Sequence, residues 1–316
     1  MKVLRALQHA GVLGINRRNS EFTLRWNPRS AYPSVDDKLL TKELCAAAGI
    51  PTPRLLAVAR HHFELRKLRE AMARLTSFVL KPARGAMGNG IVVVCERDGE
   101  RFRLAGGRSI TLDDLSYHAA GVISGLYALA GQDDTAIVEE RLLVHPELAA
   151  ITSEGVPDVR VVVYRGIPVM AMTRLPTSRS GGRANLHQGA VAAGIDLESG
   201  RTTHAILHSQ PIQRHPDTGE ALLGRSIPGF GDALRHALRA ADGTNLGYVG
   251  ADLVVDAERG PVLLEMNARP GLMIQLANRA GLLPRLRAVD RYAANGRSVA
   301  ERIALAFTIA RGGGEA

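Results

Sequence analysis

The chain has few of the residues that build disulfide scaffolds, zinc sites or membrane spans. Only two cysteines, Cys45 and Cys95, occur among 316 residues, and their spacing is not typical of metal ligation, which argues against a disulfide-rich or zinc-binding protein. No apolar run is long enough to span a bilayer, and polar side chains interrupt residues 1–10 too often for a signal peptide. These absences predict a globular protein of the reducing cytoplasm that does not contact a membrane.

Aromatic residues are scarce as well, with six Phe, six Tyr and one Trp. Basic residues outnumber acidic residues by 40 to 31, which gives a formal charge of +9 and raises the alternative of a nucleic-acid-binding protein. The basic residues are scattered, however, and few aromatic side chains are present to stack on bases. A cleft for an anionic small molecule, such as a nucleotide, explains the charge equally well.

Two short apolar runs near the C-terminus, residues 247–256 and 261–271, predict a β-hairpin around the polar turn 257–260. If the loop has these four residues, Asp256 faces Pro261 across the hairpin. One face is then expected to carry the apolar side chains Val262, Leu264 and Met266.

The opposite face of this hairpin carries polar side chains. Glu265 and Asn267 are two residues apart on one strand, so both leave the same face, and the same register places Asp252 opposite Glu265. Two carboxylates and an amide oxygen suit a hard divalent cation, and so few protein ligands favour magnesium. The alternative is a hairpin whose outer face is merely solvated.

A glycine-rich loop separates two predicted strands, residues 77–84 and 91–95. Because its glycines do not open a helix, the pattern differs from a P-loop and from a dinucleotide-binding fingerprint. Backbone N–H groups at Gly85, Gly88 and Gly90 could close over phosphates, with Lys81 supplying a positive charge to the same anion. The loop is therefore predicted to be a mobile lid, and a plain mobile turn is the alternative.

Other segments have recognisable patterns. Ser34 or Asp36 is expected to cap a helix that runs to residue 48, with Lys38 in its first turn, and further helices are expected at 63–75, 111–130, 230–242 and 298–311. Residues 158–164 and 167–174 predict a second hairpin, on which Asp158 and Arg160 share a face; a salt bridge on an edge strand is the alternative interpretation. Residues 144–157 are predicted to be an exposed insertion, and 176–189 a long polar loop.

Together these motifs resemble an ATP-grasp ligase over roughly residues 34–290. The resemblance extends to ribosomal-protein glutamate ligases and to α-L-glutamate ligase-like proteins. It rests on five motifs in the order that the family has: residues 78–82 with the glycine loop, 138–140, 158–160, 183–187, and Asp252 with 265–271. It implies an α+β fold in which two subdomains grip ATP.

The resemblance also implies roles for particular residues. Nucleotide contacts are implied for Lys38, Lys81, Gly85, Gly88, Gly90, Glu139, Glu140, Leu142 and Asp158, with the adenine hinge formed by Glu139, Glu140 and Leu142. Arg160, Arg183 and Asn185 would hold the transferred phosphate and the acyl intermediate. Asp252, Glu265 and Asn267 would bind two Mg²⁺ ions, with Glu265 bridging them; Mn²⁺ could replace Mg²⁺.

The resemblance divides the chain into three parts: a short N-terminal segment (1–33), an N-terminal ATP-grasp subdomain with the lid (34–142), and a C-terminal subdomain with the magnesium and substrate site (143–316). The usual full-size N-terminal domain is reduced to 33 residues, which are expected to bury little core. Their arginines, with Arg269, favour an acidic amino acid or short acidic peptide as substrate, although solvated surface arginines are the alternative.

The implied reaction joins a carboxylate to an amine with ATP, through an acylphosphate, and glutamate is expected as donor or acceptor. The resemblance leaves open a homo-oligomer and the identity of both substrates. A catalytically silent ATP-binding regulator is the alternative function, and the intact set of Asp252, Glu265 and Asn267 argues against it.

Overall fold

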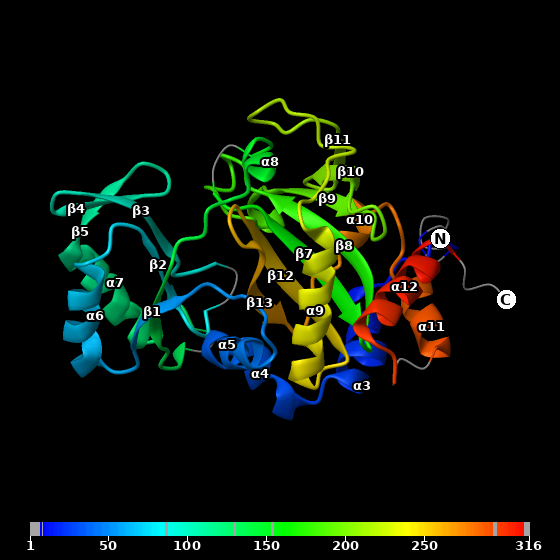
Figure 1. Cartoon of the computed structure of the whole chain (residues 1–316), viewed down its shortest axis with the longest axis horizontal. Helices are drawn as coiled ribbons and strands as arrows, with labels where there is room; N and C mark the ends of the chain where they lie inside the picture. The colour runs from blue at the N-terminus through cyan, green and yellow to red at the C-terminus, as the bar shows by residue number, and fades with distance from the viewer. Residues whose placement is uncertain are drawn as a thin grey trace.

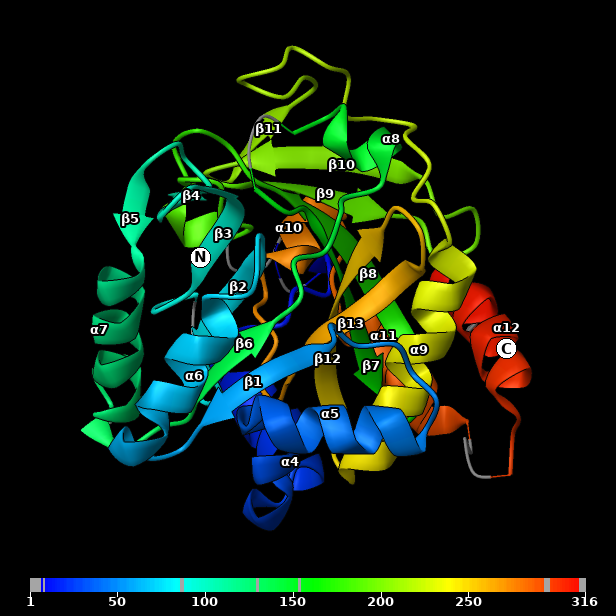
Figure 2. The same cartoon turned by 60° about the vertical axis from the view of Figure 1, so that its left-hand side comes forward.

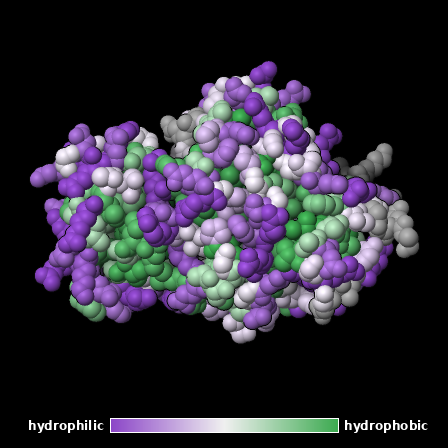
Figure 3. Space-filling view, in the orientation of Figure 1, coloured by the Kyte–Doolittle hydropathy of each residue, from purple (hydrophilic) through white to green (hydrophobic). Residues whose placement is uncertain are grey.

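The protein has two lobes, each built on an antiparallel sheet. The computed structural model describes residues 7, 9–85, 88–128, 131–152, 155–292 and 296–312. A six-stranded sheet forms the small lobe and a seven-stranded sheet forms the large lobe (Figure 1). Helices together with two antiparallel sheets confirm the predicted α+β class. In Figure 3, hydrophilic residues predominate across the middle of the molecule, where the lobes meet, and hydrophobic residues appear mainly on either side.

The small lobe packs helices on one sheet. Its strand order is β1 (Leu55–Ala59), β6 (Ala136–Glu139), β2 (Phe78–Pro82), β3 (Val92–Asp98), β4 (Arg101–Leu104) and β5 (Ser109–Thr111). A 3-10 turn (His62–Glu64) leads into helix α6 (Leu65–Met72), and α7 (Leu112–Ile123) begins at the predicted capping box of Thr111 and Asp114. α7 ends earlier than predicted, because Gly125 leaves the helix with a φ of +75°.

The large lobe has the longer sheet and most of the helices. Its strand order is β11 (Gln210–Ile212), β10 (Thr202–Leu207), β9 (Val191–Ile195), β8 (Ile167–Leu175), β7 (Asp158–Tyr164), β12 (Tyr248–Asp256) and β13 (Gly260–Asn267). Its helices are α8 (Pro146–Ala149), α9 (Phe230–Thr244), α10 (Ile274–Ala277), α11 (Leu283–Arg291) and α12 (Val299–Ala310), with a 3-10 turn at Leu186–Gln188. Among the described residues, no helix combines the length and the apolar character that crossing a bilayer requires.

The predicted insertion at 144–157 is not simply exposed. It contains α8, and the side chains of Leu148 and Ile151 are each only 1% exposed within the core of the large lobe. Val144 also forms an isolated bridge with Asp256 at the end of β12. The prediction was wrong because Pro, Ser and Gly obscured a short helix that buries two large apolar side chains.

The hairpin of β12 and β13 has the predicted pairing of Asp252 with Glu265, reached by a different path. Asp256 pairs with Gly260 instead of Pro261, so the loop is one residue shorter than predicted. A bulge between Asp252 and Leu253 then shifts the register by one residue and restores the pairing of Asp252 with Glu265. The bulge also turns Met266 into the main core, whereas Val262 and Leu264 pack in a separate cluster, so the expectation that all three share a face was wrong.

The N-terminal segment buries more than its length predicted. It comprises α2 (Ile15–Arg17), a π-helical turn (Arg18–Thr23), α3 (Leu24–Trp26), a 3-10 turn (Arg29–Ala31) and α4 (Pro33–Asp36). Leu13 and Phe22 are 1% and 3% exposed, and the Phe22 ring packs edge-on against Tyr164 with 5.5 Å between ring centroids. The segment therefore completes the core beside β7 and β12.

Asn27 fixes the end of this segment to the large sheet. Its side-chain amide donates to the backbone oxygens of Tyr248 (2.7 Å) and Ala268 (3.0 Å), and its Oδ1 accepts from the Tyr248 N–H (2.9 Å). Asn27 is only 3% exposed. One polar side chain thus satisfies three buried backbone groups, which would otherwise lack partners.

Helix α5 (Lys38–Ala47) lies between the lobes in both views (Figures 1 and 2). Its N-cap is Asp37, whose carboxylate accepts from the Leu39 N–H at 2.9 Å. The prediction that Ser34 or Asp36 caps this helix was therefore wrong. The Lys38 N–H donates to Ala83 of the small lobe, and Arg239 of the large lobe donates to the oxygen of Ala48 at the far end. α5 is therefore bonded to both lobes.

We expect Asn27→Ala to lower the free energy of unfolding by roughly 2–4 kcal/mol, because three buried backbone groups lose their partners. Asn16→Ala, at an exposed position of the same segment, should change it by less than about 0.5 kcal/mol. Urea denaturation followed by circular dichroism measures both. Equal midpoints for the two variants would contradict the anchoring role of Asn27.

Candidate active site

Four charged side chains, three of them buried and one half-buried, form an ion-pair cluster on the face of the large sheet. Both Arg160 and Arg174 contact Asp252: Arg160 Nε lies 2.7 Å from Oδ1, and its Nη2 lies 2.5 Å from Oδ2. Arg174 Nη2 lies 2.8 Å from the same Oδ2, and its Nε donates to Asp158 Oδ1 at 2.7 Å. Because β7 is flanked by β8 and β12, the interpretation of a salt bridge on an edge strand was wrong.

Arg174 was not predicted as a site residue. A simple count from the turn between β7 and β8, where Tyr164 pairs with Ile167, would place Thr173 opposite Asp158. An irregularity between Val162 and Val163 shifts the pairing by one residue and puts Arg174 there instead. No sequence signal marks that shift, so a register count would have missed Arg174.

The pKa values of the two carboxylates in the cluster shift in opposite directions. Burial raises the pKa of Asp158 to about 6, although Arg174 opposes the shift. Burial alone would also raise the pKa of Asp252, but Arg160 and Arg174 outweigh it and hold this pKa at about 2. Asp252 therefore stays ionised because two guanidinium groups surround it.

Glu265 and Asn267 lie beside this cluster at the end of β13. The Glu265 side chain is 41% exposed, and Lys38 Nζ from α5 lies 4.0 Å from its Oε2. Asn267 Oδ1 accepts from the Arg269 N–H at 2.8 Å. The predicted magnesium ligands are thus close together at the junction of the lobes.

The donor set of Asp252, Glu265 and Asn267 fits Mg²⁺ in its chemistry, because all three offer oxygen atoms. Among the described residues, no three His, Cys, Asp or Glu side chains gather as they would around a metal ion. Both carboxylate oxygens of Asp252 are engaged by arginines, whereas the Glu265 carboxylate is accessible. Glu265 is therefore the best placed of the three to meet an ion, and Asp252 would have to loosen an arginine contact.

Lys81 and Glu139 meet inside the small lobe. Lys81 Nζ on β2 lies 2.5 Å from Glu139 Oε2, and Lys42 Nζ on α5 lies 2.8 Å from Glu139 Oε1. The Glu139 side chain is 2% exposed, and its pKa is lowered because the two lysines outweigh the effect of burial. Lys42 was not predicted, although it stands one helical turn after Lys38, on the same face of α5.

The expected hinge follows β6. The Glu140 N–H donates to the Arg54 oxygen at 3.0 Å, and its carboxylate accepts from the Arg54 N–H and pairs with Arg259, both at 2.7 Å. Leu142 packs with Val254 and Val262 in a small apolar cluster. The hinge thus joins an anchored glutamate to an apolar surface.

The glycine loop connects the antiparallel strands β2 and β3, as predicted. Lys38 Nζ donates to the Gly85 oxygen at 2.9 Å. Gly90 has a φ of +75°, and a Cβ there would lie 2.6 Å from the Tyr127 ring, so glycine is required by both backbone and packing. Gly88 has open space around it. Ala86 and Met87, at the tip of the predicted lid, lie outside the described residues.

Arg183 and Asn185 lie on the loop between β8 and β9. Asn185 Oδ1 accepts from the His187 N–H at 3.0 Å and starts the 3-10 turn. Arg183 is exposed. In the part of the chain that the structure describes, neither side chain has a hydrogen bond or ion pair with the buried cluster, so the structure does not bring these two expected residues to it.

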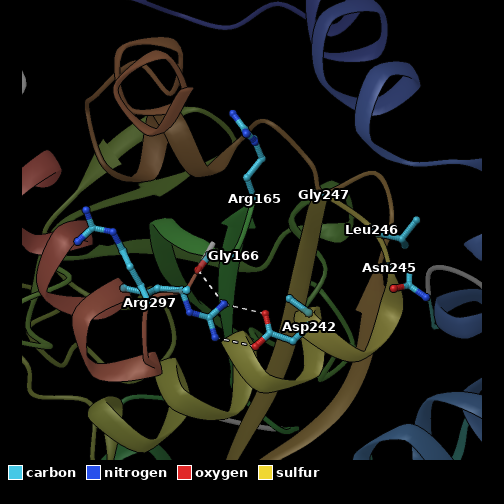
Figure 4. Close-up of a pocket in the computed structure, with 10 residues that line it drawn as sticks. Arg165, Gly166, Asp242, Asn245, Leu246, Gly247 and Arg297 are labelled. Atoms are coloured by element: carbon cyan, nitrogen blue, oxygen red, sulfur yellow. Dashed lines mark hydrogen bonds and ion pairs between the residues drawn. The ribbon is translucent and has the colours of Figure 1, made fainter. Parts of the chain in front are cut away.

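A cavity of about 450 Å³ lies at the other end of β7. It is lined by Arg165, Gly166 and Arg297, among others, and Arg302 pairs with Asp242 at 2.6 Å along its wall (Figure 4). A seven-residue strand separates this end from Asp158, a distance of roughly 20 Å. None of the predicted site residues lines this cavity.

Several solved structures are similar to the chain. The ATP-grasp ligase PsnB complexed with a minimal precursor is 18% identical, with a TM-score of 0.44, over 84% of this chain and 63% of that chain. The D-cycloserine synthetase DcsG is 13% identical, with a TM-score of 0.43, over 91% and 72%. D-alanyl-alanine synthetase A from Vibrio cholerae is 14% identical, with a TM-score of 0.44, over 88% and 66%. The chain thus spans less than two thirds of the length of PsnB.

No protein of curated function matches the sequence. The model of one protein family, described as sugar-transfer associated ATP-grasp, matches residues 17–291, well over half of the chain. This match confirms the ATP-grasp assignment and the predicted fold. The chain belongs to the sugar-transfer associated ATP-grasp family.

Proposed function

We propose that the protein is an ATP-dependent, ADP-forming ligase that joins a carboxylate to an amine. One observation carries the proposal: Asp252 and Glu265 are paired across β12 and β13, and the Lys38 ammonium of α5 lies 4.0 Å from Glu265. Two carboxylates of the large lobe that could bind a metal ion therefore lie next to Lys38. The Lys38 ammonium in turn donates to the Gly85 oxygen of the glycine loop in the small lobe, the loop that we propose covers the phosphates. Phosphoryl transfer asks a protein mainly for such positioning and charge neutralisation.

The reaction has two steps. The substrate carboxylate attacks the γ-phosphorus of ATP and releases ADP, which leaves an acylphosphate; the amine then displaces phosphate and an amide forms. Lys38 and Lys81 hold the phosphates, and the N–H groups at Gly85, Gly88 and Gly90 cover them. Glu140 and Leu142 meet the adenine. Glu139 contributes only its backbone there, because its carboxylate pairs with lysines.

The large lobe supplies the remaining groups. Glu265, Asn267 and Asp252 would hold Mg²⁺, which when bound would neutralise phosphate charge. Asp158 holds Arg174 in place. Arg160, at the centre of the sheet, binds the transferred phosphate. Arg183 and Asn185, on the loop after β8, are the groups that would contact the acyl intermediate.

Glutamate is proposed as donor or acceptor. Arg18 and Arg269 lie near one another, since Arg269 adds to the effect of burial in lowering the pKa of Arg18. Arg269 also sits over the Tyr32 ring at 5.3 Å and is exposed. Arg17 pairs instead with Glu21. Arg18 is buried and donates to the Pro270 oxygen at 3.0 Å, so the exposed positive charge beside Asn267 comes from Arg269, and it favours an acidic substrate.

The direct test is incubation with ATP, Mg²⁺ and pools of amino acids, with products identified by mass. We expect ADP release that depends on an added carboxylate and an added amine. A silent ATP-binding regulator would bind ATP and release no ADP under any combination.

Glu265→Gln should lower turnover by at least ~10²-fold, the effect of removing one preorganised charged group. The change is nearly isosteric and the side chain is 41% exposed, so the melting temperature should stay within a few degrees. Glu258→Gln, on the exposed turn of the same hairpin, is the matched control. Near-parental turnover in Glu265→Gln would contradict the metal assignment.

Arg269→Ala should raise the KM for glutamate more than the KM for ATP, because the lost charge faces the acidic substrate. We expect the KM for glutamate to rise at least ~10-fold more than the KM for ATP, on the scale of one charge-assisted contact. Arg287→Ala, at an exposed position of α11, should change neither constant. Vigorous ligation of neutral amino acids with none of glutamate would refute the acidic substrate and leave the ligase proposal intact.

A further inference from the structure

Two lysines share one buried carboxylate where α5 meets the small sheet. Lys42 comes from α5 and Lys81 from β2, and their ammonium groups lie 2.8 and 2.5 Å from the two oxygens of Glu139. The side chains of the three residues are 14%, 9% and 2% exposed. The three residues lie on three separate elements, α5, β2 and β6, so the arrangement depends on the fold.

The charges of this group do not cancel. Glu139 carries one negative charge against two positive charges, and a buried charge without a counter-charge is costly. The neighbouring Lys38 adds a third ammonium, which faces Glu265 at 4.0 Å and the backbone oxygens of Ala83 and Gly85. Asp134 is also near Lys38, but its carboxylate accepts from the Arg84 and Thr135 N–H groups. The excess charge around Glu139 is thus arranged to receive an anion.

Lys42 has a second partner inside the protein. Besides Glu139 it contacts the Pro53 oxygen at 2.5 Å, on the segment that leads into β1. Burial lowers the pKa of Lys42, and Glu139 opposes the shift. The ammonium therefore has two partners inside the protein, and phosphate does not need to be one of them.

We propose that Lys42 is a positioning residue for the nucleotide phosphates: it neutralises Glu139, so that Lys81 keeps a net positive charge for the phosphate. This inference rests on the proposed function, since it assumes that ATP binds at Lys81. Without Lys42, Glu139 would neutralise Lys81 and repel the phosphates. If Lys42 only held α5 on the sheet, its loss would lower the stability of the protein and weaken the binding of the ATP analogue and of adenosine by the same factor.

A double-variant cycle separates these roles. Affinities for a non-hydrolysable ATP analogue with Mg²⁺, and for adenosine, are measured by calorimetry for the parental protein, Lys42→Met, Glu139→Gln and the double variant. Lys42→Met should weaken binding of the analogue by at least ~10-fold and leave adenosine binding unchanged, because only the phosphates respond to the charge. The double variant should return to within about threefold of the parental affinity, because Lys81 again lacks a neutralising carboxylate.

Lys67→Met, an exposed lysine on α6, is the matched control, and Lys42→Gln replaces Lys42→Met should the latter not fold. A double variant that binds as weakly as the single Lys42 variant overturns the inference, as does an unchanged affinity in Lys42→Met. Absence of nucleotide binding by the parental protein would overturn the proposed function together with this inference. Parental binding with no effect of Lys42 would overturn the inference alone.

Discussion

The large lobe depends on four charges that have been removed from water together. Asp158, Arg160 and Asp252 are buried and Arg174 is half-buried on three adjacent strands, where an unpaired charge would be strongly destabilising. Each carboxylate therefore needs its guanidinium in a defined place, and the irregularity between Val162 and Val163 puts Arg174 opposite Asp158. The strands cannot slip by one residue without leaving a buried charge alone.

Further along β7 and β12, the same face of the sheet carries an aromatic core. The rings of Tyr164 and Tyr248, on β7 and β12, meet Phe22 and Trp26 of the N-terminal segment. About twenty residues of the N-terminal segment cover the apolar half of the face, and the polar half forms the candidate site.

Much of the site could be predicted from the sequence because its residues stand in short local patterns. Glu265 and Asn267 are two apart on a strand, and the glycine loop lies between two apolar runs. Arg174 could not be predicted, because its place opposite Asp158 depends on an irregularity with no sequence signal. Lys42 had a signal, its helical spacing from Lys38, but its partner Glu139 is distant in sequence. The core of the N-terminal segment was also missed, since its partners Tyr164 and Tyr248 lie far along the chain.

Helix α5 has a mechanical consequence for how the molecule opens. Its first residue is hydrogen-bonded to Ala83 and Gly85 of the small lobe, and Ala48, just past its last turn, accepts from Arg239 of the large lobe. Pulling the lobes apart across the helix would break the bonds at one end or the other. Because its two ends are bonded to different lobes, α5 acts as a tie that limits how far the lobes can separate.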